Sequence, residues 1–194
     1  MAKATQNFFK TLVLMLAGSI LVLYGIGAIL SKQWSVETTR RLRTTPAALA
    51  SQLTDLRAWM KWSLANIHLG SPTETKHEGE AGKVGQRVVW TGPLGRSVLT
   101  LHAVTPDAIE YAYSYERNGE TGPPSANGSG RISWVVEGAE CVVRWREGGE
   151  WENVIARWWG WFGAKQEKVG QFQISSLQSL QQELERVAAA ADGK

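Results

Sequence analysis

The chain has little of the chemistry on which enzyme signatures are built. It contains one cysteine and three histidines among 194 residues. A single Cys141 excludes an intramolecular disulfide. The histidines, His68, His77 and His102, lack the His-x-x-x-His and Cys-x-x-Cys spacings that are typical of zinc sites. We therefore predict that the chain binds no metal and that each histidine is a surface or structural residue.

Motifs for nucleophilic catalysis, phosphate binding and nucleic-acid binding are absent as well. No Gly-x-Ser-x-Gly sequence occurs. The glycines within 92–95 and 119–130 lack the lysine and the strand-to-helix context of a phosphate-binding loop. The 21 basic and 18 acidic residues leave a formal charge of +3 and are interspersed, whereas nucleic-acid-binding surfaces concentrate positive charge. The sequence thus predicts no catalytic residue, no cofactor and no nucleic-acid partner.

A long apolar run lies near the N-terminus. Residues 12–30 contain no charged side chain and are bracketed by Lys10 and Lys32. At about 1.5 Å per residue, a helix over this run covers the hydrocarbon thickness of a bilayer. The sequence predicts a tail over 1–11, a transmembrane helix over 12–30 and a short linker over 31–33. The alternative is a cleaved signal peptide, but its apolar region is usually about 7 to 15 residues long, so the length favours an anchor.

Two arguments about the orientation of this helix oppose each other. Four basic residues between 32 and 43 outnumber the two lysines of the tail, which places the domain after the helix in the cytoplasm. A short tail before a long domain, however, is typical of a signal anchor that exports its C-terminal domain. The side of the membrane therefore stays open.

The remainder reads as short strands followed by one long helix. Alternation of apolar and polar residues predicts strands over 34–44, 84–91, 97–104, 109–116, 131–137 and 141–147. Thr45-Pro46 predicts the start of a short helix, and Asp55 is expected to cap a second one. The glycines, prolines and serines of 118–130 predict a mobile loop.

The last segment, Gly163 to Ala191, has the pattern of an amphipathic helix. Apolar residues recur there at three- and four-residue spacing, namely at Val169, Phe172, Leu177, Leu180, Leu184 and Val187. Such a helix is only marginally stable alone in water. We therefore expect it to pack against the sheet that the strands form.

The run Asp55-Leu56-x-x-Trp59-x-x-Trp62, placed after the first strand and the Thr-Pro helix start, resembles the START-like (SRPBCC) superfamily. The similarity is to its polyketide cyclase/dehydrase and lipid-transport branch, and it extends to the strand at 85–91 and to the terminal helix. Ser63-Leu64 departs from the Ser-Pro often found there. The resemblance implies an α+β helix-grip fold over 34–190, in which a seven-stranded antiparallel sheet wraps around the long C-terminal helix.

The resemblance also implies a hydrophobic cavity between the sheet and the terminal helix. The chain has ten tryptophans, and a high tryptophan content often reflects a wide cavity, an interface or a membrane boundary. The candidate ligand-binding residues that line the cavity are Trp59, Trp90, Tyr111, Tyr113, Trp134, Trp145, Trp158, Phe162 and Phe172. The aromatic residues over 158–162 alternatively only cap the core where the helix begins, or meet the membrane interface.

We predict a single-pass protein of the bacterial plasma membrane that binds a hydrophobic small molecule or lipid without catalysis. No particular ligand or protein partner is indicated. One alternative is a polyketide cyclase or dehydratase, which two or more buried polar side chains in the cavity would favour. Tyr111 and Tyr113 are candidates, whereas Arg144 alternates away from that face. The other alternative is a protein-interaction module whose cavity is filled by its own tryptophans.

Overall fold

The computed structural model describes residues 2–64, 74–119, 126–151, 153–191 and 193. They form two compact units. The N-terminal unit comprises Met1–Trp34 and Glu150–Lys165, and the sheet unit comprises Ser35–Gly149 and Gln166–Lys194.

A seven-stranded sheet with the order β1-β7-β6-β5-β4-β3-β2 is the framework of the fold. Its strands are β1 Gln33–Leu42, β2 Glu74–Glu78, β3 Arg87–Gly92, β4 Gly95–Thr105, β5 Ala108–Arg117, β6 Ala126–Glu137 and β7 Glu140–Glu150. From β2 to β7 each strand pairs antiparallel with the next. The strand β1 lies beside β7. This meander confirms the antiparallel sheet that the sequence predicts.

Five helices accompany the sheet in the described part of the chain, namely α1 Ala2–Ile29, α2 Pro46–Thr54, α3 Leu56–Trp62, α4 Val154–Trp161 and α5 Ala164–Ala191. The Thr45 hydroxyl accepts a hydrogen bond from the Ala48 amide at 3.2 Å and caps α2. The Asp55 carboxylate accepts one from the Arg57 amide at 3.0 Å and caps α3. Both caps satisfy amides that have no partner inside their helix, and both were predicted.

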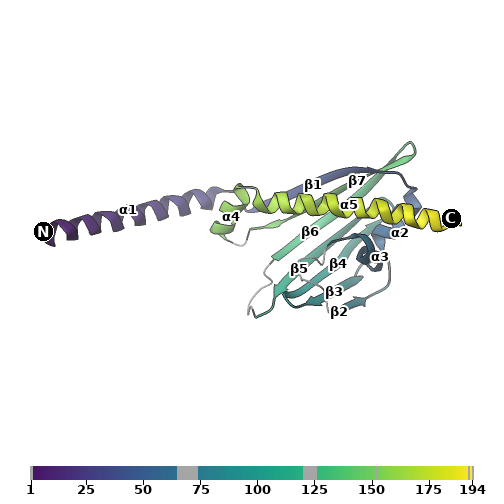
Figure 1. Ribbon diagram of the computed structural model, residues 1–194, viewed down its shortest axis with the longest axis horizontal. Helices are drawn as coiled ribbons and strands as arrows, with labels where there is room; N and C mark the ends of the chain where they lie inside the picture. The colour runs from purple at the N-terminus through teal and green to yellow at the C-terminus, as the bar shows by residue number, and fades with distance from the viewer. Residues whose placement is uncertain (1, 65–73, 120–125, 152, 192, 194) are drawn as a thin grey trace. The chain divides into compact units, whose positions relative to one another are not determined.

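The terminal helix α5 crosses one face of the sheet (Figure 1). Its buried face combines leucines with polar side chains, namely Leu177, Leu180, Leu184, Gln173, Ser176 and Glu183. The apolar stripe that the sequence predicts is therefore only partly buried, because Val187 at its C-terminal end is 38% exposed. The helix-grip arrangement of sheet and long helix is confirmed.

Three elements differ from expectation. The predicted loop over 118–130 is wrong in its last part, because β6 already begins at Ala126. The glycines of β6 leave space for the large tyrosine rings of the neighbouring strand β5. The edge strand β2 has mostly exposed side chains, so it shows no alternation that a sequence could reveal. The helix α4 falls within the aromatic segment 151–163, for which no element was predicted.

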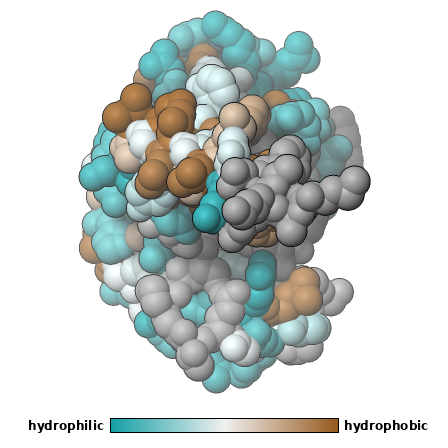
Figure 2. Space-filling model, turned by 90° about the vertical axis from the view of Figure 1, so that its left-hand side faces the viewer, coloured by the Kyte–Doolittle hydropathy of each residue, from teal (hydrophilic) through white to brown (hydrophobic). Residues whose placement is uncertain are grey.

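In the N-terminal unit, α1 is an apolar helix with an exposed surface. Its segment Phe9–Ile29 is long and apolar enough to cross a membrane, and only 6% of its most apolar window is buried. A signal sequence passes the same test of length and composition. Seen from the side of Figure 1 on which α1 begins, hydrophobic side chains gather over part of a mainly hydrophilic surface (Figure 2).

Candidate functional site

Six aromatic side chains meet in the interior of the sheet unit. They are Trp59 and Trp62 from α3, Tyr111 and Tyr113 from β5, Trp145 from β7 and Phe172 from α5. We call them the aromatic cluster. Trp59 is at its centre, with ring centroids 5.0 Å from Trp62, 5.3 Å from Tyr111 and 6.3 Å from Trp145. These edge-on and tilted geometries are the ones that aromatic pairs prefer.

The short helices hold one wall of the cluster in place. The indole of Trp59 donates to the Leu53 carbonyl at 2.8 Å, and that of Trp62 donates to the Gln52 carbonyl at 3.3 Å. Both acceptors lie in the last turn of α2, where carbonyls have no partner inside their own helix. The motif that carries the family resemblance therefore ties α3 to α2 and points two indoles inward.

Two glycines in β6 make room for the tyrosines of β5. Gly130 pairs with Tyr111 and Gly128 pairs with Tyr113. A Cβ at Gly130 would lie 2.2 Å from Cζ of Tyr111, and one at Gly128 would lie 2.4 Å from the Tyr113 hydroxyl. The tyrosine rings therefore lie directly over the glycine backbone. This packing also explains why a glycine-rich segment forms a strand.

The room above Gly130 lets Tyr111 reach β7. Gly130 pairs on its other side with Glu147, and the Tyr111 hydroxyl donates a hydrogen bond to the Glu147 carboxylate. The Trp145 indole in turn donates to the Tyr111 oxygen at 2.7 Å. Glu147 is only 7% exposed. The aromatic interior thus contains a buried acid. We use the name Glu147 site for the group of four side chains formed by Glu147, Tyr111, Trp145 and Gln173, the last of which is described below.

Burial controls the protonation of these groups. Loss of hydration raises the pKa of Glu147 above its ordinary value, and the hydrogen bond from Tyr111 opposes that rise. The pKa of Tyr111 is raised well above the usual phenol value, first by burial and then by the nearby Glu147. Burial and Glu147 likewise raise the pKa of Tyr113. Both phenols therefore remain protonated donors at neutral pH.

Gln173 of α5 completes the site from the helix side. It is fully buried, and its interaction with Glu147 lowers the pKa of that acid. The amide nitrogen is the group that can donate to that carboxylate, whereas the amide oxygen has no partner among the described residues. Buried polar atoms normally have a partner, so one acceptor in this interior is available to another molecule.

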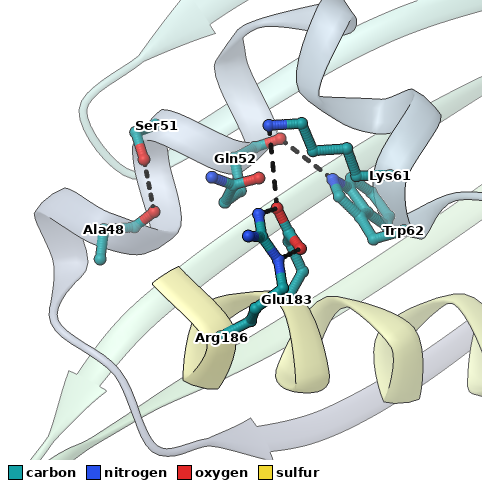
Figure 3. A network of polar contacts seen from close by, with 7 residues as sticks. All are labelled: Ala48, Ser51, Gln52, Lys61, Trp62, Glu183 and Arg186. Carbon is teal, nitrogen blue, oxygen red and sulfur yellow. Dashed lines mark hydrogen bonds and ion pairs between the residues drawn. The ribbon is translucent and has the colours of Figure 1, made fainter. Parts of the chain in front are cut away.

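A second polar network joins α2, α3 and α5 and has a structural role (Figure 3). Glu183 is 8% exposed and accepts two hydrogen bonds from Arg186, at 2.6 and 2.7 Å. The Lys61 ammonium of α3 lies 3.8 Å from the same carboxylate. The Arg186 hydrogen bonds are the main reason why the pKa of Glu183 is lowered. This network fastens α3 to α5 beside the aromatic cluster.

Seven of the nine predicted cavity residues belong to the core of the sheet unit. Trp59, Trp90, Tyr111, Trp134 and Trp145 are buried in it, and Tyr113 and Phe172 pack against it. Trp158 and Phe162 lie elsewhere, in the N-terminal unit, where their rings are 6.5 Å apart. Arg144 is exposed, as its alternation predicts. Among the described residues, no group of three or more His, Cys, Asp or Glu could hold a metal ion.

The sequence reading missed Glu147 and Gln173. A signal for Glu147 was present, because the inward alternation of Cys141, Val143 and Trp145 continues to it. An acid at an inward position was read as the end of the strand. Gln173 gave no such signal, because it follows Phe172 on the border of the apolar stripe.

Residues 33–190 match the family described as polyketide cyclase / dehydrase and lipid transport. The chain belongs to this family. The START-like resemblance read from the Trp59 and Trp62 motif is thereby confirmed. The sequence matches none of the curated proteins with which it was compared.

Solved structures share the family's fold at low identity. A protein from Mesorhizobium loti is 14% identical, with 79% of this chain and 98% of that chain covered and a TM-score of 0.55. One from Chromobacterium violaceum is 16% identical, with 78% and 96% covered and a TM-score of 0.53. Major latex-like protein 151 of Panax ginseng is 10% identical, with 79% and 98% covered and a TM-score of 0.51. At these identities the likeness shows the helix-grip fold alone.

Proposed function

We propose that the protein binds a hydrophobic small molecule or lipid inside the sheet unit, between the sheet and α5, and that α1 anchors it in a membrane. The family description includes lipid transport, and the interior carries six interacting aromatic rings. Burying apolar ligand surface contributes about 25 cal/mol per Å². An aromatic interior of this kind therefore supplies affinity for an apolar ligand.

The observation that carries the proposal is the Glu147 site within that interior. In ligand sites, a few placed polar groups set the orientation of a mainly apolar molecule. The amide oxygen of Gln173 and the carboxyl of Glu147 are such groups. We infer an apolar ligand with at least one hydrogen-bonding group that meets Gln173.

The exposed apolar surface of α1 supports anchoring. The helix carries large apolar side chains on all sides, with Leu14 and Leu21 exposed by 71% and 72%. A helix that is apolar all round is suited to a membrane rather than to water. Its contacts with α4 also favour an anchor over a cleaved signal peptide, because cleavage would remove the partner of α4.

Native mass spectrometry of the full chain, released gently from detergent, tests ligand binding. We expect the wild-type protein to retain an apolar molecule that can be extracted and identified. Gln173→Leu should lose it, whereas Arg144→Gln, on the exposed side of β7, should keep it. An empty wild-type protein that also takes up no apolar dye would contradict the proposal and favour the filled interaction module.

A second candidate function is a cyclase or dehydratase reaction, and the Glu147 site favours it. A buried acid whose pKa is raised by loss of hydration is a candidate for proton transfer to or from a substrate. It lies beside a protonated phenol and the amide of Gln173. If the site is catalytic, Glu147→Gln should retain a bound precursor that is heavier than the wild-type ligand by one water or that is not cyclised. An identical ligand in both proteins would support binding without chemistry.

A further inference from the structure

The short helix α4 packs closely on the end of α1 within the N-terminal unit. The Trp158 indole donates to the Leu23 carbonyl at 3.1 Å, and the Arg157 guanidinium donates to the Ala28 carbonyl at 3.0 Å. The contact passes over Gly27, where a Cβ would lie 2.5 Å from Nε1 of Trp158 and 2.5 Å from Cγ1 of Val154. The helices approach this closely because Gly27 has no side chain.

A groove of about 510 Å³ lies between the two helices. Ile20, Leu23 and Tyr24 of α1 line it, with Ile155, Trp158 and Phe162 on the other side. Large apolar side chains that line the groove or lie beside it remain exposed in this unit. Ile155 is 68% exposed, Trp161 66% and Phe162 68%. The rings of Trp161 and Phe162 are 5.3 Å apart, so exposed apolar side chains lie along α4 and just past its C-terminal end.

The position of the groove along α1 indicates what covers this surface. Its α1 residues, from Ile20 to Tyr24, lie inside the apolar segment Phe9–Ile29. Val154 lies at Gly27, Trp158 one turn later in α4 reaches back to the Leu23 carbonyl, and the groove extends to Ile20, so α4 is antiparallel to α1 and reaches back along it. The seven residue steps from Gly27 to Ile20 correspond to about 10 Å of helix rise. If α1 spans a bilayer, the groove lies at the depth of acyl chains.

Polar groups lie at the N-terminal end of α4 and apolar groups lie at its far end, as expected if the far end is the deeper one in the membrane. Its N-terminus has the exposed cap Asn153 and, one turn later, Arg157 at the last turn of α1. Its far end carries Trp161 and Phe162, and the next charged residue is Lys165. Interfacial helices insert their apolar face about 5–10 Å into the headgroup and acyl boundary. Tryptophan rings are favoured at that boundary.

We propose that α4 is a membrane-inserted helix and that a lipid acyl chain occupies the groove between α1 and α4. The anchor is then a helical pair rather than a single span. This inference rests on the proposed anchoring by α1 and is independent of ligand binding in the sheet unit. The lining is apolar throughout the groove, which suits a hydrocarbon chain and offers no specific site to a polar molecule.

Site-directed spin labelling of the full chain in phosphatidylcholine vesicles tests the depth of α4. The single Cys141 permits a Cys141→Ala background in which one cysteine is introduced at a time. The test positions are Ile155 and Phe162. Leu21 of α1 is the membrane reference, and Leu94, an exposed leucine of the sheet unit, is the aqueous reference. Accessibility is compared between oxygen, which concentrates in lipid, and a water-soluble nickel chelate.

We expect labels at 155 and 162 to resemble the label at 21, with the label at 162 deeper than the label at 155. Labels at 155 and 162 that resemble the label at 94, while the label at 21 remains in lipid, would overturn the inference and leave the anchor intact. A label at 21 that is itself aqueous would overturn the anchor as well. Protection at 162 from both reagents, with spin–spin broadening that vanishes on dilution by unlabelled protein, would show a second copy in the groove instead of lipid.

A matched pair of glycine variants tests whether docking on α1 sets this depth. Gly27→Leu should push α4 away from α1 and shift the label at 162 toward water. Gly25→Leu adds the same side chain where a Cβ meets nothing within 4 Å, so it should leave the label unchanged. Equal behaviour of the two variants would overturn the role of the α1–α4 contact.

Discussion

The hydroxyl of Tyr111 on β5 reaches the carboxylate of Glu147 on β7 by passing over Gly130 of the strand between them. Three adjacent strands thus cooperate to place one acid in an aromatic interior. The hydrogen bond compensates part of the cost of burying that acid. Single substitutions in these strands and in the network that fastens α5 should therefore have measurable effects on stability.

Gly130→Ala should destabilise the protein. The new Cβ would lie 2.2 Å from Cζ of Tyr111, and overpacking of this kind costs about 1 to 3 kcal/mol. Gly170→Ala is the matched control, because a Cβ there lies 3.7 Å from Cγ1 of Val36 in ordinary contact and alanine favours a helix by about 1 kcal/mol. Unfolding in denaturant, followed by circular dichroism, should show opposite signs for the two variants.

Glu147→Gln should change how stability depends on pH. Because the folded pKa of Glu147 is raised, its contribution to stability is fully present below the ordinary glutamate pKa of about 4.3 and is lost as pH rises through the folded value. The glutamine side chain of the variant does not titrate, so only the wild type loses this stability as pH rises. The stability of the variant relative to wild type should therefore increase with pH, by about 1.4 kcal/mol per unit of pKa shift. A difference between the two proteins that stays constant between pH 4 and pH 8 would contradict the raised pKa.

Tyr111→Phe should raise the pKa of Glu147 further. The tyrosine hydrogen bond is the largest effect that lowers this pKa, and losing it leaves a buried carboxylate without that donor, at a cost of about 2 kcal/mol. The pH dependence of stability should therefore extend to higher pH. Tyr113→Phe removes a hydroxyl from the neighbouring ring of the same strand and should have the smaller effect on that dependence.

Glu183→Gln should alter the pH dependence in the opposite sense from Glu147→Gln. The folded pKa of Glu183 is lowered, mainly by Arg186, so its contribution is present above the ordinary glutamate pKa and is lost as pH falls through the folded value. The variant should lower the melting temperature at neutral pH and converge with wild type in acid. Glu185→Gln on the exposed side of α5 is the control and should leave the melting temperature almost unchanged.

Local sequence patterns predicted much of the fold. The spacing of Leu177, Leu180 and Leu184 was sufficient for α5, and Thr45 and Asp55 marked the helix starts at which the structure has caps. The family resemblance supplied the number of strands, which alternation alone did not. The edge strand β2 was not predicted because its residues are mostly exposed. The helix α4 was not predicted because a run of tryptophans shows no clear helical period.

The candidate site was only half predictable. Tyr111 and Trp145 were identified as inward residues of their strands, and both are buried in the aromatic cluster. The acid beside them was not assigned, because a buried glutamate is rare unless partners compensate its burial. Those partners come from β5, β7 and α5, so no local window of sequence contains them.

By itself, the sequence determined the apolar helix α1, the terminal helix α5, the helix caps and most strands, because periodicity and capping act between residues a few positions apart. Only the tertiary structure decided that Glu147 is buried against Tyr111 and Gln173, and that Trp158 packs on Leu23. These outcomes depend on which side chains the fold brings together from distant segments. Burial then raises the pKa of the acid, and the amide oxygen of Gln173 is left without a partner among the described residues.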